Sequence, residues 1–327
     1  MTLRAGRIRL CLLMAVACPA TALAQSGAES YPSKPVTIIT TSSGSSSAEM
    51  RLYAEKTTES MGRPFVIVDR PGAGGTLATG MVAKSAPDGY TLLLGSANFT
   101  TAPAFHKSLQ YDPIRDFAPV SILSKRPTVL MVHPSLPVKS AREYFAYARA
   151  NPGKINFGTV GPGSTTHINS AWMHSAAKVK VTNVHYKGTG ALLPDLLSGR
   201  IQATAISFLS SMPLIKSGKT QALGITTAAR SKLWPELPTV TEQGAPGYDY
   251  SSWLGLIAPA RTPRPVIDKL HEHFARAAQD PEIFRRLSGD FIEIVSTRPE
   301  QAAAFIREEI ERWKSMSEEI GLIEETD

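Results

Sequence analysis

The stretch that decides the fold is residues 35–50, PVTIITTSSGSSSAEM, where a short apolar run leads through hydroxyl side chains into a helical pattern. The alternation in residues 36–39 is typical of a β-strand, and the pattern from Glu49 to Met61 is typical of a helix. Six of the seven residues from 40 to 46 carry a hydroxyl group, and none of the seven is charged. Such a strand–loop–helix junction is compatible with a solvated linker or with a loop that holds an anion.

Short β-rich runs alternate with helical patterns along the chain at the spacing of βαβ units. This alternation predicts an α/β fold with parallel sheets flanked by helices. We expect strands at residues 35–40, 64–68, 90–95, 128–133, 154–158, 181–185, 201–206 and 221–226. We expect helices at residues 48–61, 76–85, 141–150, 167–177, 189–198, 264–278, 281–287 and 299–319. After Pro259 the pattern is wholly helical, which predicts a C-terminal helical layer packed on a sheet.

The first 24 residues have the pattern of a secretory signal peptide. Three arginines within residues 4–9 precede a short apolar stretch, and residues 22–24, Ala-Leu-Ala, have the small side chains of a cleavage site. A lipoprotein signal that ends at Cys18 is the alternative. Both cysteines of the chain lie in this leader, so we expect no thiol chemistry in the mature protein. The leader, residues 1–24, predicts export to the periplasm.

The charge of the chain argues against a nucleic-acid partner. The net charge is +7, and the leader contributes three arginines without an acid, which leaves +4 for the mature part. Basic residues are spread among acidic ones, and no basic stripe or aromatic ladder is present. A mild positive surplus suits a small anionic ligand.

Two further stretches have the composition of ligand-binding loops. Residues 161–167, GPGSTTH, leave a predicted strand and enter a predicted helix, as residues 40–47 do. A helix N-terminus exposes backbone N–H groups and the positive end of the helix dipole, so hydroxyl donors there can hold a carboxylate or phosphate. Simple N-capping by Ser47 and Ser164 is the alternative. Residues 70–75, RPGAGG, lack the lysine of a phosphate-binding loop and are interpreted as a glycine-rich turn.

An enzyme is the less favoured class of function. Ser164 and His167 lie three residues apart, but no G-x-S-x-G elbow surrounds the serine, so an exported serine hydrolase is kept only as an alternative. His271 and His273 do not share a helix face, which argues against a zinc pair. We therefore expect neither a metal nor another cofactor.

Eight short motifs occur in collinear order along nearly the whole mature chain. They are YPSKPV from Tyr31, DRPGAGG from Asp69, PDGYTL from Pro87, YDPIRDFAPV from Tyr111, HPS from His133, YKG from Tyr186, DLLSG from Asp195 and SWLGLIAP from Ser252. Each motif is weak alone, but the ordered set resembles the Bug family, the TctC-like periplasmic substrate-binding proteins of tripartite tricarboxylate transporters.

The resemblance implies a two-lobed periplasmic binding protein, type II-like, in which two crossing strands join two mostly parallel sheets flanked by helices. We place the crossovers near residues 124–128 and 248–252. Lobe I then comprises residues 31–125 and 252–327, and lobe II comprises residues 126–251. The resemblance also implies a small anionic carboxylate as ligand, a tripartite tricarboxylate-type membrane permease as partner, and no enzymatic activity. We expect a monomer, and a signalling co-receptor without transport is the alternative role.

In the family, two loops pin the carboxylate of the solute, one loop from each lobe. These loops match residues 40–47 and 161–167, and other polar residues at strand ends are expected beside them. The predicted ligand-binding residues are Thr40, Thr41, Ser42, Ser43, Gly44, Ser45, Ser46, Ser47, Ser96, Asn98, Gly161, Gly163, Ser164, Thr165, Thr166, His167, Tyr186 and Ser207. Asn98 is expected in a loop beside the cleft or in a plain turn.

Two acids that many relatives carry are absent from this chain. The first loop lacks the usual aspartate, for which Glu49 and Ser47 are the alternative replacements, and residues 205–208, AISF, lack the Phe-Asp pair. An amino-acid ligand needs a counter-charge for its ammonium group. We therefore expect a neutral pocket that favours a dicarboxylate or an aromatic carboxylate, in which Glu49 does not act as an ammonium partner.

Overall fold

A computed structural model describes residues 30–320, except residues 42–44, 71, 73–74, 107 and 162–163. The predicted leader and both cysteines lie outside the described residues. The elements follow in the order β1 (Val36–Thr40), α2 (Ser45–Met61), β2 (Phe65–Asp69), α3 (Thr76–Ala83), β3 (Thr91–Ser96), α4 (Ala97–Phe105), β4 (Phe117–Val132), α5 (Ala141–Ala150), β5 (Asn156–Thr159), α6 (Thr165–Ala176), β6 (Thr182–His185), α7 (Thr189–Leu197), β7 (Ala203–Ser207), α8 (Phe208–Lys216), β8 (Gln221–Ile225), β9 (Ser251–Pro259), α9 (Arg264–Ala278), α10 (Pro281–Gly289), β10 (Glu293–Ile294) and α11 (Pro299–Ile320).

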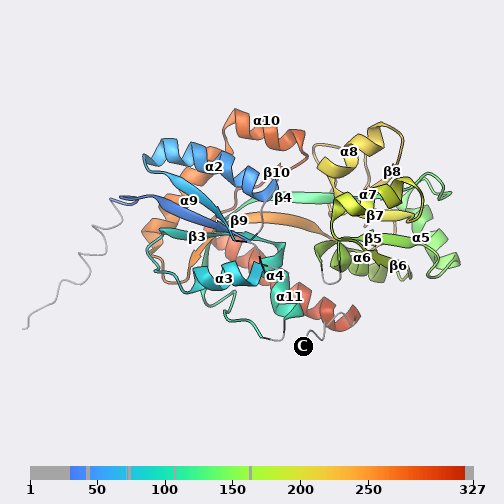
Figure 1. Ribbon diagram of the computed structural model, residues 1–327, viewed down its shortest axis with the longest axis horizontal. Coiled ribbons are helices and arrows are strands. Elements are labelled where there is room, and N and C mark those ends of the chain that lie inside the picture. Colours follow the sequence, from blue (N-terminus) through green and yellow to red (C-terminus); the bar gives the residue numbers. More distant parts are fainter. Residues whose placement is uncertain are drawn as a thin grey trace, which may run out of the picture.

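Two lobes are joined by two crossing strands, β4 and β9 (Figure 1). In one sheet β1 runs parallel to β2 and β3, and in the other β5 runs parallel to β6 and β7. β4 pairs with β9 through residues 117–127 and with β7 and β8 through residues 128–132, so this strand belongs to both sheets. The predicted two-lobed α/β fold is confirmed, while the lobe boundaries at residues 125/126 and 251/252 stay a prediction.

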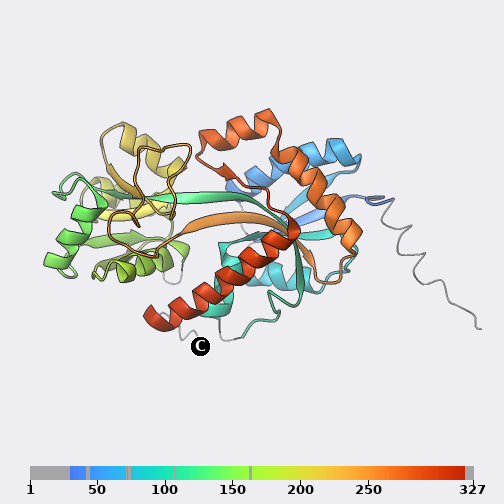
Figure 2. The same ribbon diagram turned by 180° about the vertical axis from the view of Figure 1, so that it is seen from behind.

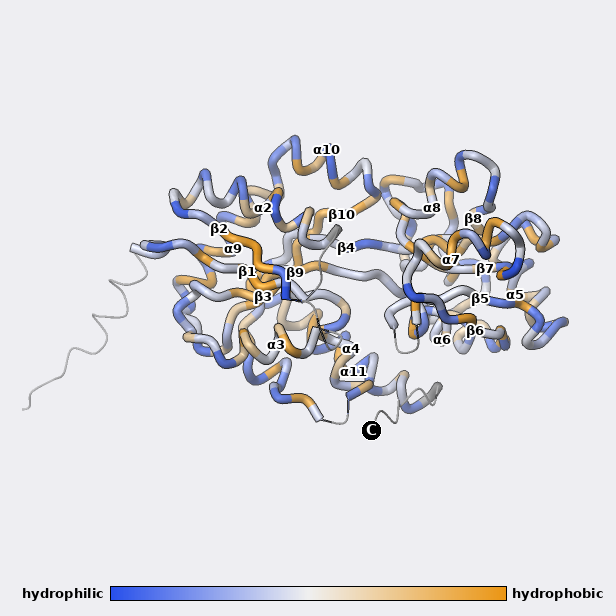
Figure 3. Tube along the Cα trace, viewed as in Figure 1, coloured by the Kyte–Doolittle hydropathy of each residue, from blue (hydrophilic) through white to orange (hydrophobic). Residues whose placement is uncertain are grey.

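Helices cover both faces of the sheet in lobe I. On one face, Met50 of α2 and Leu270 of α9 pack on buried strand residues such as Ile38. On the other face, side chains of α3 and α4 pack with Ile306 of α11. The strands between these layers are largely hydrophobic, and the outer turns of α10 carry hydrophilic residues (Figure 3).

Helix α11 reaches from lobe I to lobe II. Ile306 and Ile310 belong to the core of lobe I, whereas Trp313 and Met316 are buried among residues of α5 and α6 in lobe II. Figure 2 shows this helix starting near one end of the two connecting strands and running below them toward the second lobe. The predicted C-terminal helical layer is therefore confirmed and also contacts the second lobe. Among the described residues, no helix is long and apolar enough to span a bilayer.

The sequence patterns do not predict helices α4 and α8 or strand β10, and they give strand β9 only as a crossover near residues 248–252. Helix α4 follows β3 without a break and contains Pro103, and its first turn includes Asn98. The expectation of a loop or plain turn at Asn98 is therefore wrong. Strand β9 contains Gly255, where a Cβ atom would lie 2.8 Å from the carbonyl oxygen of Ser121 on β4. The close approach of the crossing strands therefore requires a glycine at this position.

Candidate functional site

Most predicted site residues lie where a strand ends and a helix begins. Strand β1 leads into α2, β3 into α4, β5 into α6 and β7 into α8. The sequence patterns predicted the first and third of these junctions, whereas α4 and α8 were not expected. Ligands of α/β folds bind beyond the carboxyl ends of strands. The candidate site is therefore built from four helix N-termini, two from each lobe.

In the first junction, hydroxyl groups bind an acid of the neighbouring strand. The Oγ of Ser47 and the Oγ1 of Thr40 donate to Oδ1 of Asp69 over 2.6 and 2.8 Å. Thr40 and Asp69 are partners in the β1–β2 register, and Arg51 lies 3.3 Å from the other carboxylate oxygen. The hydrogen bond from Ser47, followed by that from Thr40, lowers the pKa of Asp69. These two buried hydroxyls thus hold the loop, and their role in ligand binding stays a prediction.

Helix α2 begins earlier than expected. It starts at Ser45, so Ser45, Ser46 and Ser47 belong to its first turn, and N-capping by Ser47 is wrong. Thr41 packs against Gly75, whose φ of 94° requires a residue without a side chain. The glycine-rich turn predicted at residues 70–75 therefore contacts the first loop. Ser42, Ser43 and Gly44 lie outside the described residues.

Glu49 is buried, with only 3% of its surface exposed. Its carboxylate forms an ion pair with Arg126 on the crossing strand β4, and Nε of Arg126 lies 3.1 Å from Oε2. The hydroxyl of Ser124 donates to the other oxygen. Glu49 is therefore neutralised by an arginine and is not directed into solvent. This geometry agrees with the expectation that Glu49 does not serve a ligand ammonium.

In the second junction, hydroxyl groups hold the loop that opens α6. Ser164 caps this helix, because its Oγ accepts from the N–H of His167 over 3.2 Å and donates to the carbonyl of Gly161. The Oγ1 of Thr166 accepts from the N–H of Val160 over 2.8 Å. The N-cap interpretation of Ser164 is confirmed. Gly163 lies outside the described residues.

The geometry at His167 does not favour a serine hydrolase. The group of His167 that meets the Ser164 hydroxyl is the backbone N–H rather than the ring. The ring packs edge-on against His185, with centroids 4.7 Å apart, and burial lowers the pKa of His167. A general base needs its ring nitrogen at the nucleophile. The structure shows the serine engaged in capping instead.

The remaining predicted residues have separate surroundings. The hydroxyl of Tyr186 donates to Asp195 over 2.8 Å, and burial raises the pKa of Tyr186 to about 12. Ser96 precedes α4 without a side-chain capping bond, and Ser207 is exposed at the start of α8. The side chain of Thr165 lies close to Tyr250 and opposes the rise that burial causes in the pKa of this tyrosine.

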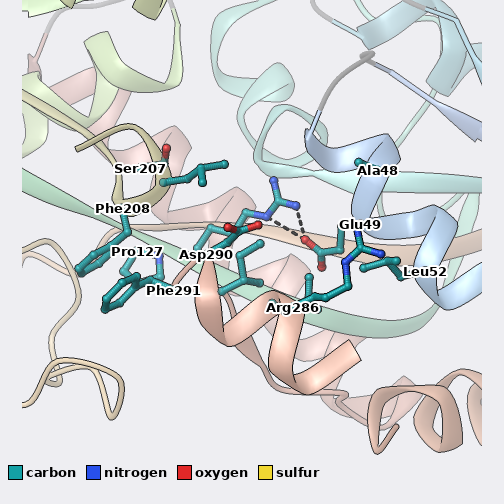
Figure 4. A pocket seen from close by; sticks show the side chains of 13 residues that line it. Ala48, Glu49, Leu52, Pro127, Ser207, Phe208, Arg286, Asp290 and Phe291 are labelled. Carbon is teal, nitrogen blue, oxygen red and sulfur yellow. Dashed lines mark hydrogen bonds and ion pairs between the residues drawn. The ribbon is translucent and has the colours of Figure 1, made fainter. Parts of the chain in front are cut away.

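A cavity of about 290 Å³ lies between the lobes beside the crossing strand, and we call it the interlobe cavity (Figure 4). Its lining residues come from α2, β4, α8 and the segment at the end of α10. They are Ala48, Glu49, Leu52, Arg126, Pro127, Ser207, Phe208, Leu209, Arg286, Leu287, Asp290, Phe291 and Ile292. Of the predicted site residues that the structure describes, only Ser207 lines this cavity, and the described residues of the 161–167 loop do not.

The interlobe cavity is not free of charge, contrary to the expectation of a neutral pocket. Arg126 and Arg286 line it together with Glu49 and Asp290. The lining thus contains two arginines and two acids, of which Arg126 and Glu49 form an ion pair.

Comparison with known proteins decides the family. The model of the tripartite tricarboxylate transporter family receptor matches residues 50–322. The chain belongs to this receptor family. Protein BugT of Bordetella pertussis is 32% identical over 298 residues, which cover 90% of this chain and 91% of BugT. The resemblance to the Bug family is thereby confirmed.

Two solved structures resemble this receptor over most of its length. R. palustris Rpa4515 with adipate is 33% identical, with a TM-score of 0.76 and coverage of 89% of this chain and 98% of that chain. MatC (Rpa3494) from Rhodopseudomonas palustris with bound malate is 32% identical, with a TM-score of 0.71 and coverage of 88% and 99%.

Three residues of the candidate site were not found from the sequence. Asp69 was noted only as part of a motif, although it ends the strand beside Thr40 and so lies at the first junction. Arg126 and Phe291 lie 77 and 242 residues from Glu49 in the chain, and no local pattern connects them. The one available signal for Arg126 was its place within the predicted crossover at residues 124–128.

Proposed function

We infer that this chain is a periplasmic receptor that captures a small organic carboxylate between its lobes and delivers it to a tripartite tricarboxylate-type permease. The interlobe cavity carries this inference, because residues of both lobes line it beside the first strand–helix junction. The family supports a transport receptor, and the adipate and malate bound by two structural neighbours support a carboxylate. Residues 1–24 act as the export signal, and the receptor works as a monomer that turns over no substrate.

The carboxylate end of the solute is held by the loops at residues 40–47 and 161–167. Both loops precede helices whose first N–H groups have no partner within the helix, so they attract an anion. Closure of the two lobes around the crossing strands brings the loops together, as in other hinged binding proteins. Ser96, Asn98, Tyr186 and Ser207 lie at the remaining strand ends and surround the solute.

Carboxylates are expected to stabilise the purified protein. A ligand at one hundred times its dissociation constant adds about 2.7 kcal/mol to the free energy of unfolding, which thermal denaturation detects. Adipate or benzoate should bind at least tenfold more tightly than glutamate in calorimetric titration, because Glu49 is already paired with Arg126. Glutamate binding at micromolar concentration that is lost in Asp290→Asn would contradict this preference and indicate an ammonium site.

Ser164→Ala and Thr166→Ala test the second loop. A hydrogen bond to a charged group contributes about 1.5 to 3 kcal/mol, so each substitution should weaken carboxylate binding roughly tenfold to a hundredfold. Titration calorimetry measures this change, and circular dichroism checks the fold. Ser140→Ala is the matched control, because Ser140 caps α5 with the same 3.2 Å bond outside the site. Equal affinity in all three variants would mean that the hydroxyls only cap the helix.

A further inference from the structure

One end of the interlobe cavity is apolar and is made by both lobes. Phe208 of α8 and Phe291 after α10 stack with ring centroids 4.6 Å apart and an interplanar angle of 9°. Figure 4 shows both rings and Pro127 at the end of the cavity opposite Leu52. Leu209 also lines the cavity and keeps 51% of its surface exposed. A ligand that covers apolar surface of this kind removes it from water, and this burial stabilises the complex.

Phe291 is held in an unfavourable backbone conformation. Its φ of 56° lies in the left-handed region, which bulky side chains rarely adopt. The next residue, Ile292, packs on the core of lobe I, whereas the Phe291 ring packs with Phe208 and Trp234 of lobe II. The segment after α10 thus extends from the core of lobe I to lobe II and places one aromatic ring in the wall of the cavity. Backbone strain of this kind is concentrated at ligand sites.

The phenylalanine end of the cavity offers little attraction for a second carboxylate. Glu49 is paired with Arg126, and Arg286 lies on the Leu52 side of the cavity (Figure 4). Asp290, which follows the end of α10, is the acid nearer to the phenylalanine rings. A charged group at the phenylalanine end would lose its hydration without a counter-ion beside it. An uncharged ring would meet aromatic and aliphatic side chains instead, in the edge-to-face or offset contacts that rings prefer.

We propose that the interlobe cavity binds the aromatic ring of an aryl monocarboxylate, and that Phe208, Leu209 and Phe291 determine this specificity. The inference rests on the proposed function, because the ring is the body of the carboxylate solute that the receptor captures. The cavity volume of about 290 Å³ lies at the small end of the range for small-molecule sites, roughly 300 to 1,000 Å³. It therefore suits a single ring.

Calorimetric titration with benzoate and malate tests the proposal on the wild type, Leu209→Ser and Phe291→Ala. Benzoate should bind the wild type at least tenfold more tightly than malate. Each substitution should weaken benzoate binding about tenfold through loss of apolar contact, and should change malate binding less than twofold. Leu77→Ser is the matched control, because Leu77 is an equally exposed leucine, at 58%, outside the cavity. Its benzoate affinity should equal that of the wild type.

The outcomes separate this proposal from the receptor function. Benzoate affinity within twofold of the wild type in both variants, or tighter binding of malate than of benzoate, would overturn the aromatic subsite and leave a carboxylate receptor. A folded wild type that binds neither benzoate, malate nor adipate would overturn both. Leu209→Ser keeps the test decisive if Phe291→Ala does not fold, because Leu209 is half exposed and contributes little to the core.

Discussion

Glu49→Ala is expected to destabilise the protein by about 3 to 5 kcal/mol, because it leaves the guanidinium of Arg126 buried without its counter-charge. Only 15% of the Arg126 side chain and 2% of the Glu49 side chain are exposed. The substitution also removes the acceptor of Ser124, which lies on the same crossing strand. Urea denaturation followed by circular dichroism measures the free energy of unfolding.

Two further variants show whether the lost charge pair is the cause. Glu272→Ala removes the acid of the exposed pair with Arg276 on α9 and should leave stability nearly unchanged. The double variant Glu49→Leu with Arg126→Met removes both charges and should recover much of the loss. A double variant no more stable than Glu49→Ala would indicate that packing rather than charge is responsible.

Trp313→Ala is expected to cost about 3 to 5 kcal/mol, the usual loss for a fully buried tryptophan. The indole is 1% exposed, packs edge-on against Trp172 and lies near Tyr250. Its N–H donates to Glu309 over 3.1 Å, so the substitution also removes a donor from a buried carboxyl group. Since α11 contacts both lobes, loss of the Trp313 side chain should weaken the coupling between the two lobes.

Denaturation by urea tests this coupling as well as the stability. We expect Trp313→Ala to lower the midpoint and to broaden the transition as lobe II unfolds before lobe I. Phe284→Ala is the matched control, because Phe284 is an aromatic residue on α10 with 58% of its surface exposed. A single sharp transition at the wild-type midpoint in Trp313→Ala would contradict a structural role for the end of α11.

The binding loops take on a more structural role than their composition suggested. Thr40 and Ser47 donate to Asp69, and Ser164 caps α6. Hydroxyl groups that already have partners within the protein hold a loop in one shape before a ligand arrives. Such preorganisation reduces the entropy cost of binding, and in the proposed function the backbone N–H groups of the helix N-termini bind the anion.

By itself, the sequence determined most of the strands and helices, the positions of the two hydroxyl-rich loops and the family. Strand and helix patterns depend on residues two to four positions apart, so they are visible in the chain without its fold. β4 was predicted only over residues 128–133, because its first half contains the polar residues and Pro119 that crossing strands tolerate. α4 was missed because it follows β3 directly and contains Pro103.

Only the tertiary structure decided which partners these residues have. The pairs Ser47 with Asp69, Glu49 with Arg126 and Trp313 with Trp172 join residues 22, 77 and 141 positions apart. The stack of Phe208 on Phe291 depends on the position of the segment after α10, which brings Phe291 from lobe I to lobe II. Such contacts follow from how the lobes pack around β4 and β9, and packing over these distances leaves no periodic trace in the sequence.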